Sequence, residues 1–205
     1  MLNLLRCPNL PVSSLLSLRS AVVRWLRINR SIIQAVIFGL ASFGLQAAPQ
    51  YQAHVAYLQG EGDVQGIKLA LQRSTEFGQP TLQQLGIGGQ LQFEFSANFW
   101  RYQPNNQTDQ NLVLALSPVW TKHIGALLQR PLDIEFGIGV SLLDDTQFAG
   151  KNVSTHYQFE DRLGLQWHLS TAHSVYLRYM HYSNGGVKKP NPGLDFIAVG
   201  YSQRF

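Results

Sequence analysis

The residues best suited to chemistry lie close together near the end of the chain. His181 and Ser183 are two positions apart, and Asp195 follows twelve residues after Ser183. Residues two apart on a β-strand project from the same face, so the imidazole and the hydroxyl share a side. Counting back from Phe205 in steps of two places Asp195 on that side as well. A serine, a histidine and an aspartate are the residue types of a nucleophilic ester hydrolase.

The face that carries these three residues is otherwise apolar. It is expected to include Val175, Leu177 and Tyr179 before His181, and Ile197, Val199 and Tyr201 after Asp195. Three polar groups would therefore emerge at one end of an apolar surface. The competing interpretation is a chance occurrence of common residues at strand ends.

The turn after Ser183 contains groups that could stabilise an oxyanion. Such a site needs hydrogen-bond donors aimed at the developing charge. Backbone N–H groups of Gly185 and Gly186 and the side-chain amides of Asn184 and Asn191 are available. We take Asn184, Gly186 and Asn191 as the candidate oxyanion or substrate residues. The alternative is that these segments form an outer loop of ordinary turn residues.

The elements that must position these residues are strands. The chain has 205 residues, 45% hydrophobic and 14% charged, and alternates apolar and polar residues most clearly over 90–99 and 132–142. Turn residues separate such runs. We expect an all-β, eight-stranded antiparallel fold and a short helix near 76–85. The expected strands are 51–59, 64–74, 86–102, 110–122, 131–143, 154–169, 173–183 and 194–205.

Two architectures fit eight alternating strands: a soluble barrel or sandwich, and a transmembrane barrel. The polar faces carry Gln, Asn, Ser and Gly with few charges, which is typical of a small barrel interior and favours a transmembrane barrel of the outer-membrane type. Phe205, a terminal aromatic after a strand, resembles the assembly signal of such barrels. We expect Trp100, Trp120 and Tyr182 to lie in aromatic girdles at the membrane interfaces.

The first 47 residues have the three parts of a secretory signal. Arginines precede an apolar stretch over 32–45, and small residues follow at Ala47 and Ala48. We expect a cleaved signal peptide over 1–47 and a barrel domain over 48–205. Five arginines of the leader account for the net charge of +4, because 11 basic and 12 acidic residues remain, a net charge of −1. Nucleic acid is therefore not an expected partner, and the single Cys7 leaves with the leader.

The histidines show no metal-ligand spacing, so neither a metal nor a cofactor is expected. Lys188 and Lys189 in the outer loop could contact phosphate or could simply be solvated. The ten steps from Phe205 back to Asp195 match one tilted strand crossing, which places Asp195 and Ser183 near the outer-leaflet headgroups.

The segments 181–186 (HYSNGG) and 190–195 (PNPGLD) resemble the PagL family of outer-membrane lipid A 3-O-deacylases. The resemblance is strong over about 173–205, with weaker echoes at 159–162 and 136–140. It implies a serine esterase in the outer membrane of a Gram-negative bacterium, which hydrolyses the ester-linked primary hydroxyacyl chain at position 3 of lipid A in lipopolysaccharide. By motif position Ser183 would be the nucleophile, His181 the base and Asp195 the orienting acid.

Two positions depart from the family pattern. Asp195 stands where Glu is usual, and Asp is shorter by one methylene, about 1.5 Å; Gly185 stands where Ala is usual. The shorter side chain of Asp195 would lower the rate of ester hydrolysis unless the pairing of the strands brings its carboxylate closer to His181. A noncatalytic outer-membrane barrel with a structural, adhesive or small-pore role is the competing hypothesis, a soluble periplasmic barrel is a third, and the sequence leaves a homodimer open.

Overall fold

The computed structural model describes residues 51–104 and 108–205, and the expected signal peptide over 1–47 lies outside the described residues. The helix expected near 76–85 is confirmed as α3. In chain order the elements are β1 (Tyr51–Gly60), β2 (Val64–Ser74), α3 (Gln79–Gln84), β3 (Gln90–Tyr102), β4 (Asp109–Leu127), β5 (Arg130–Leu143), β6 (Gln147–Phe148), β7 (Lys151–Asn152), β8 (Tyr157–His168), β9 (His173–Ser183) and β10 (Leu194–Arg204).

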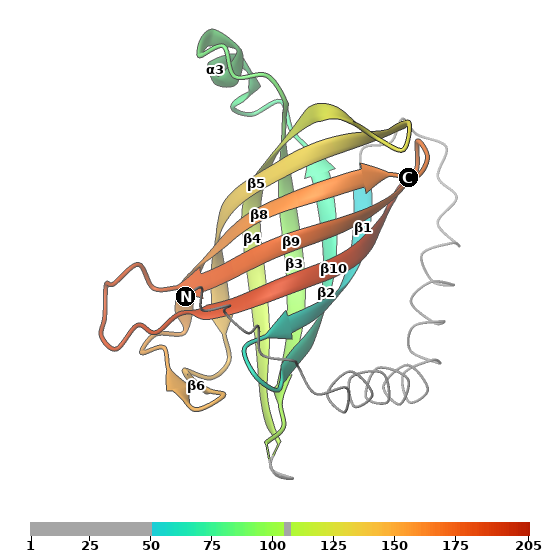
Figure 1. The fold of residues 1–205 in the computed structure, drawn as a ribbon. Coiled ribbons are helices and arrows are strands. Elements are labelled where there is room, and N and C mark those ends of the chain that lie inside the picture. The colour runs from blue at the N-terminus through green and yellow to red at the C-terminus, as the bar shows by residue number, and fades with distance from the viewer. Residues whose placement is uncertain (1–50, 105–107) are drawn as a thin grey trace, which may run out of the picture. The chain divides into compact units, whose positions relative to one another are not determined.

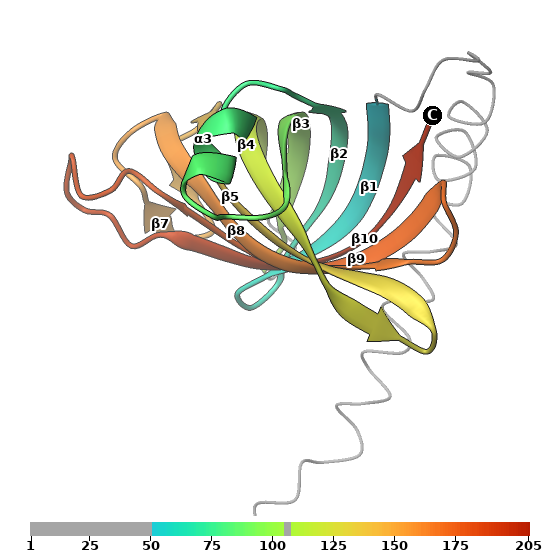
Figure 2. The same ribbon diagram turned by 90° about the horizontal axis from the view of Figure 1, so that it is seen from above.

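Eight of these strands close into a barrel, which confirms the expected fold class. Their order around the barrel is β1-β10-β9-β8-β5-β4-β3-β2, and every neighbouring pair is antiparallel. The first strand pairs with the last, so the sheet has no free edge. Figures 1 and 2 show α3 at the barrel end where β10 finishes. The opposite end, formed by the β1–β2 turn, β6, β7 and the β9–β10 loop, is called the distal rim below.

Two expected strands had wrong boundaries, and one short strand pair was not predicted. Residues 86–89 precede β3, because Gly86 and Gly89 adopt positive φ values that end the extended conformation. β4 continues to Leu127 through an irregularity in register between His123 and Gly125, so it is longer than expected. The 144–156 connection holds the short β6–β7 pair, which alternation over two residues could not predict.

The outer surface of the barrel is apolar, as expected for a transmembrane barrel and not for a soluble one. Large apolar side chains alternate outward along the strands. The exposed set comprises Leu71, Phe95, Phe99, Leu112, Leu114, Leu116, Phe136, Ile138, Val140, Leu142, Leu163, Leu165, Leu177, Tyr179, Ile197 and Val199. Within residues 51–104 and 108–205, no helix combines the length and apolar character needed to cross a bilayer.

The middle of the barrel interior is filled by an ionic network. Its cations are Lys68, Arg162 and Arg178, its anions are Glu94, Glu135 and Glu160, and all six side chains are at most 1% exposed. Glu94 lies 3.3 Å from the Lys68 ammonium and 2.7 Å from the Arg162 guanidinium. Three cations pair with three anions, and their burial shows that the middle of the barrel is packed with polar side chains.

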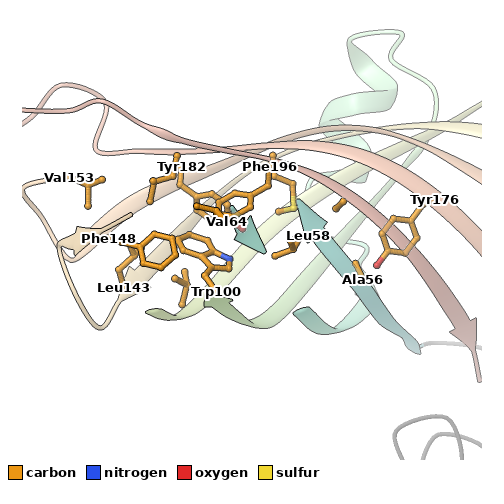
Figure 3. Packing of buried hydrophobic residues seen from close by; sticks show 14 residues of the cluster. Ala56, Leu58, Val64, Trp100, Leu143, Phe148, Val153, Tyr176, Tyr182 and Phe196 are labelled. Carbon is orange, nitrogen blue, oxygen red and sulfur yellow. The ribbon is translucent and has the colours of Figure 1, made fainter. Parts of the chain in front are cut away.

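An aromatic cluster fills the interior near the distal rim. The Trp100 ring lies 4.7 Å from that of Tyr182 and 4.6 Å from that of Phe196, and Phe148 packs from the β6–β7 segment (Figure 3). Trp100 and Tyr182 were therefore wrongly expected in the girdles, since both are buried. Each lies an even number of positions from the inward-facing polar residues of its strand, so its side chain points into the barrel.

Candidate active site

The pairing of β9 with β10 brings two of the expected residues face to face. Asp195 is the direct cross-strand partner of His181. Their side chains are 31% and 32% exposed, whereas the adjacent Tyr182 and Leu194 point inward and are buried. His181, Ser183 and Asp195 thus share the outward face at the distal rim, as expected from parity.

The short side chain of Asp195 reaches the imidazole. Its Oδ1 lies 2.7 Å from His181 Nδ1, within hydrogen-bond distance. Directly opposed residues of an antiparallel pair have Cβ atoms about 4.5–5.5 Å apart. At this separation an aspartate, although one methylene shorter than a glutamate, is long enough to reach His181. The same Oδ1 accepts a hydrogen bond of 2.5 Å from the Tyr179 hydroxyl.

Ser183 is the last residue of β9 and lies opposite Phe159 of β8. It is two residues from His181, about 7 Å along the strand. Among the described residues no hydrogen bond joins its hydroxyl to His181. Because Nδ1 of His181 faces Asp195, Nε2 is the ring nitrogen left for the serine. Catalytic hydrogen bonds are often long without substrate and tighten in the complex.

The β9–β10 loop uses two of the four donors that the sequence offered for an oxyanion. Asn184 is fully buried, and its Nδ2 donates to the carbonyl oxygens of Val153 and Lys188 at 3.1 and 2.9 Å. The Gly186 N–H donates to Asn184 Oδ1 at 2.9 Å. These contacts give Asn184 and Gly186 a loop-forming role and tie the loop to the 144–156 connection.

The side-chain amide of Asn191 keeps an unused donor group. Its Oδ1 accepts the Asn184 N–H at 3.1 Å, whereas its Nδ2 makes no hydrogen bond within the described part of the chain. The Gly185 N–H is likewise without a partner there. Of the four donors that the sequence offered, Nδ2 of Asn191 and the N–H of Gly185 are therefore the two that remain for a ligand.

Gly193 approaches the imidazole closely. It has φ of +72°, and a Cβ at this position would lie 2.7 Å from His181 Cε1. The glycine lets the loop backbone pass against the ring. Lys151 joins the same region by donating to Gly193 O at 3.1 Å and pairing with Glu61 at 2.7 Å. A hollow of about 280 Å³ lies between this pair and Asp195. Lys188 and Lys189 are exposed in the loop.

Two residues beside His181 were not predicted from the sequence as part of the site. Asp161 of β8 is its direct partner on the other side, and no hydrogen bond joins the two among the described residues. Tyr179 was recognised only as a member of the apolar face, although its hydroxyl bonds Asp195. Parity could have found Asp161, because it is a carboxylate in an otherwise apolar row with Phe159, Leu163 and Leu165.

These features define a small outer-membrane β-barrel that carries a polar cluster of hydrolase residue types on its lipid-facing surface. The model of the family described as lipid A 3-O-deacylase (PagL) matches residues 65–204. The chain therefore belongs to the lipid A 3-O-deacylase (PagL) family. It is a protein of the outer membrane of a Gram-negative bacterium.

Two relatives and one solved structure agree. The lipid A deacylase PagL of Bordetella bronchiseptica is 31% identical over 189 residues, which cover 89% of this chain and 100% of the relative. The lipid A deacylase PagL of Pseudomonas aeruginosa is 29% identical over 113 residues, 55% of this chain and 65% of the relative. The crystal structure of the outer membrane enzyme PagL is 24% identical, covers 74% of this chain and 97% of that chain, and has a TM-score of 0.57.

Proposed function

We propose that Ser183, His181 and Asp195 carry the activity of this protein, which its family membership identifies as a lipid A 3-O-deacylase. The observation that carries the proposal is the Asp195–His181 hydrogen bond of 2.7 Å on the outward face of the barrel, with Ser183 on the same face. A carboxylate on one ring nitrogen sets the tautomer that leaves the other as a base.

In the proposed reaction Ser183 Oγ attacks the carbonyl carbon of the ester at position 3 of lipid A, and its proton moves to His181 Nε2. The tetrahedral intermediate collapses as His181 returns the proton to the sugar oxygen. This step leaves an acyl-serine, and water activated by His181 then releases the hydroxy fatty acid and restores Ser183. Asp195 faces the imidazolium formed in each step.

We assign oxyanion stabilisation to the Gly185 N–H and Asn191 Nδ2, the two of the four donors named from the sequence that have no partner in the described chain. Asn184 and Gly186 are assigned to holding the loop that presents them. The amide of Asn191 is itself held through its Oδ1, which orients its Nδ2.

The surroundings suit a lipid substrate. Leu177, Ile197 and Val199 continue the outward face away from the site and are about half exposed. An acyl chain can lie along this surface while its ester stands at the rim. Outer-membrane barrels have their termini on the periplasmic side, so the distal rim lies at the outer leaflet, where lipid A resides.

Labelling with a serine-directed fluorophosphonate tests the proposed nucleophile. Detergent-folded protein should be labelled at Ser183, and both Ser183→Ala and His181→Ala should abolish labelling. Ser174→Ala is the control, since Ser174 lies on the same strand but is buried in the interior. Labelling that persists in folded Ser183→Ala would reject Ser183 as the nucleophile, and absence of labelling in folded wild type would favour a noncatalytic barrel.

A further inference from the structure

We propose that Tyr179 is a positioning residue for this reaction, acting through its hydrogen bond to Asp195. The inference rests on the proposed function. The Tyr179 hydroxyl donates to Asp195 Oδ1 at 2.5 Å, and the same oxygen lies 2.7 Å from His181 Nδ1. One carboxylate oxygen thus joins the tyrosine to the imidazole.

The position of Tyr179 makes this contact specific. It is two residues before His181 on β9 and pairs directly with Ile197 of β10, so Asp195 is its diagonal neighbour across the strand pair. Diagonal neighbours are within reach of long aromatic side chains. Tyr179 is 47% exposed on the lipid-facing surface, and its hydroxyl bonds Asp195, which lies nearer the distal rim.

Asp195 needs such support because it lies at the edge of the protein. It is the second residue of β10, faces outward and is about one-third exposed, so few groups enclose its carboxylate. A hydroxyl donor stabilises the ionised form and fixes the carboxylate plane. Held in this way, Asp195 accepts from His181 Nδ1 and keeps Nε2 directed to the side of Ser183.

A simpler interpretation is that Tyr179 is an interface tyrosine whose hydroxyl bonds to the nearest acceptor. The chain offers a matched control for it. Tyr201 of β10 stands on the same outward face toward the opposite rim, and its hydroxyl lies 2.6 Å from His173 Nδ1. Both tyrosines lie on the β9–β10 pair and both make one short hydrogen bond, but only Tyr179 contacts the proposed site.

The test compares Tyr179→Phe with Tyr201→Phe in detergent-folded protein. The readouts are the rate of fluorophosphonate labelling at Ser183 and kcat for lipid A deacylation. Tyr179→Phe should lower both by about tenfold to a hundredfold, the size expected for losing one hydrogen bond to a charged group. Tyr201→Phe should leave both within about twofold. Equal rates for the two variants would overturn the proposal.

The Asp195→Asn background separates positioning from a general structural effect. If Tyr179 acts through the Asp195 carboxylate, Tyr179→Phe should cause no further loss in this background. The same fractional loss in both backgrounds would overturn the proposal. Tyr179→Trp, which keeps an aromatic ring with an N–H donor, should recover part of the rate.

Should Tyr179→Phe fail to fold, the comparison of Tyr179→Trp with Tyr179→Leu replaces it, since only the former keeps a donor. A higher rate in Tyr179→Trp supports the proposal, and equal rates overturn it. Labelling that persists in Ser183→Ala would instead reject the proposed nucleophile, whatever the behaviour of Tyr179.

Discussion

At the scale of single residues, two carboxylates flank His181, and strand register places both directly opposite it. Asp195 on β10 bonds Nδ1 at 2.7 Å, whereas no hydrogen bond joins Asp161 on β8 to the ring among the described residues. The hydrogen bond therefore distinguishes the orienting acid from a neighbouring charge. An aspartate suffices in this role because the two strands hold it opposite the imidazole.

Asp195→Asn should lower kcat for lipid A deacylation by about a thousandfold or more, because an amide at this position no longer enforces the required tautomer. Asp161→Asn is the matched control and should stay within about fivefold. Release of hydroxy fatty acid from lipid A measures both. A large loss in Asp161→Asn with a small one in Asp195→Asn would exchange the roles of the two acids.

Gly193→Ala should lower activity by about tenfold or more, because the added Cβ would stand 2.7 Å from His181 Cε1 and push the ring away from Asp195. Gly62→Ala shares a positive φ at the same rim but meets no atom within 4 Å. It therefore carries similar backbone strain without the clash. Similar activity in the two variants would show that the close approach of Gly193 is unimportant.

At the scale of elements, the β9–β10 loop depends on the 144–156 connection. Asn184 joins the two through its hydrogen bond to Val153 O, and Phe148 and Val153 anchor the connection inside the barrel. Because the 144–156 connection packs against it, the β9–β10 loop can hold Gly185 and Asn191 in fixed positions. The loop donors are thus ordered by a segment that is distant in sequence.

Asn184→Asp should loosen this loop, because it places a carboxylate against the two carbonyl oxygens that now accept from Nδ2. Limited trypsin cleavage after Lys188 should become at least several-fold faster while the barrel stays folded. Asn152→Asp is the control, since its Oδ1 can still accept the Ser154 N–H. Unchanged cleavage in Asn184→Asp would mean that the loop is held by other contacts.

Alternation in the sequence was sufficient to predict the eight barrel strands, although not all of their bounds, and the face on which each residue lies, because side chains on a strand have a period of two. The limits of β9 and the outward placement of His181, Ser183 and Asp195 followed from this rule. The same alternation places Trp100 and Tyr182 inside the barrel, where the structure has them. The expectation of girdle positions was wrong because it followed from their aromatic type and not from their position on the strand.

Contacts between distant segments could not be predicted in the same way. The hydrogen bond from Asn184 Nδ2 to Val153 O depends on how the 144–156 connection enters the barrel, and no local sequence pattern predicts this path. The Tyr179–Asp195 hydrogen bond depends on the register of β9 against β10, which alternation alone leaves free by steps of two.

At the scale of the whole molecule, the charged interior stabilises the wall that carries the site. Glu94→Gln should destabilise the barrel by about 3–5 kcal/mol, since it leaves Arg162 and Lys68 buried with one partner fewer. Glu61→Gln breaks an ion pair in which Glu61 is 61% exposed and should cost about 1 kcal/mol or less. Urea titration followed by the heat-modifiable gel shift measures both. Equal midpoints would contradict a stabilising role for the network.

The barrel also explains how a hydrolase can act on a lipid from its outer surface. The ionic network and the aromatic cluster fill the middle and the distal part of the interior, so substrate approaches from the side, along the apolar outer wall. The ester then meets polar side chains only at the rim. This arrangement requires a closed, rigid wall, and pairing of β1 with β10 supplies it.

The most direct test of the proposed nucleophile and substrate is mass spectrometry of lipid A after incubation with detergent-folded protein, beside Ser183→Ala folded in the same way. Wild type alone should remove one hydroxyacyl chain, from position 3, and Ser183→Ala should leave lipid A intact. Loss of the chain in both samples, or in neither although both are folded, would contradict a Ser183-dependent lipid A 3-O-deacylase.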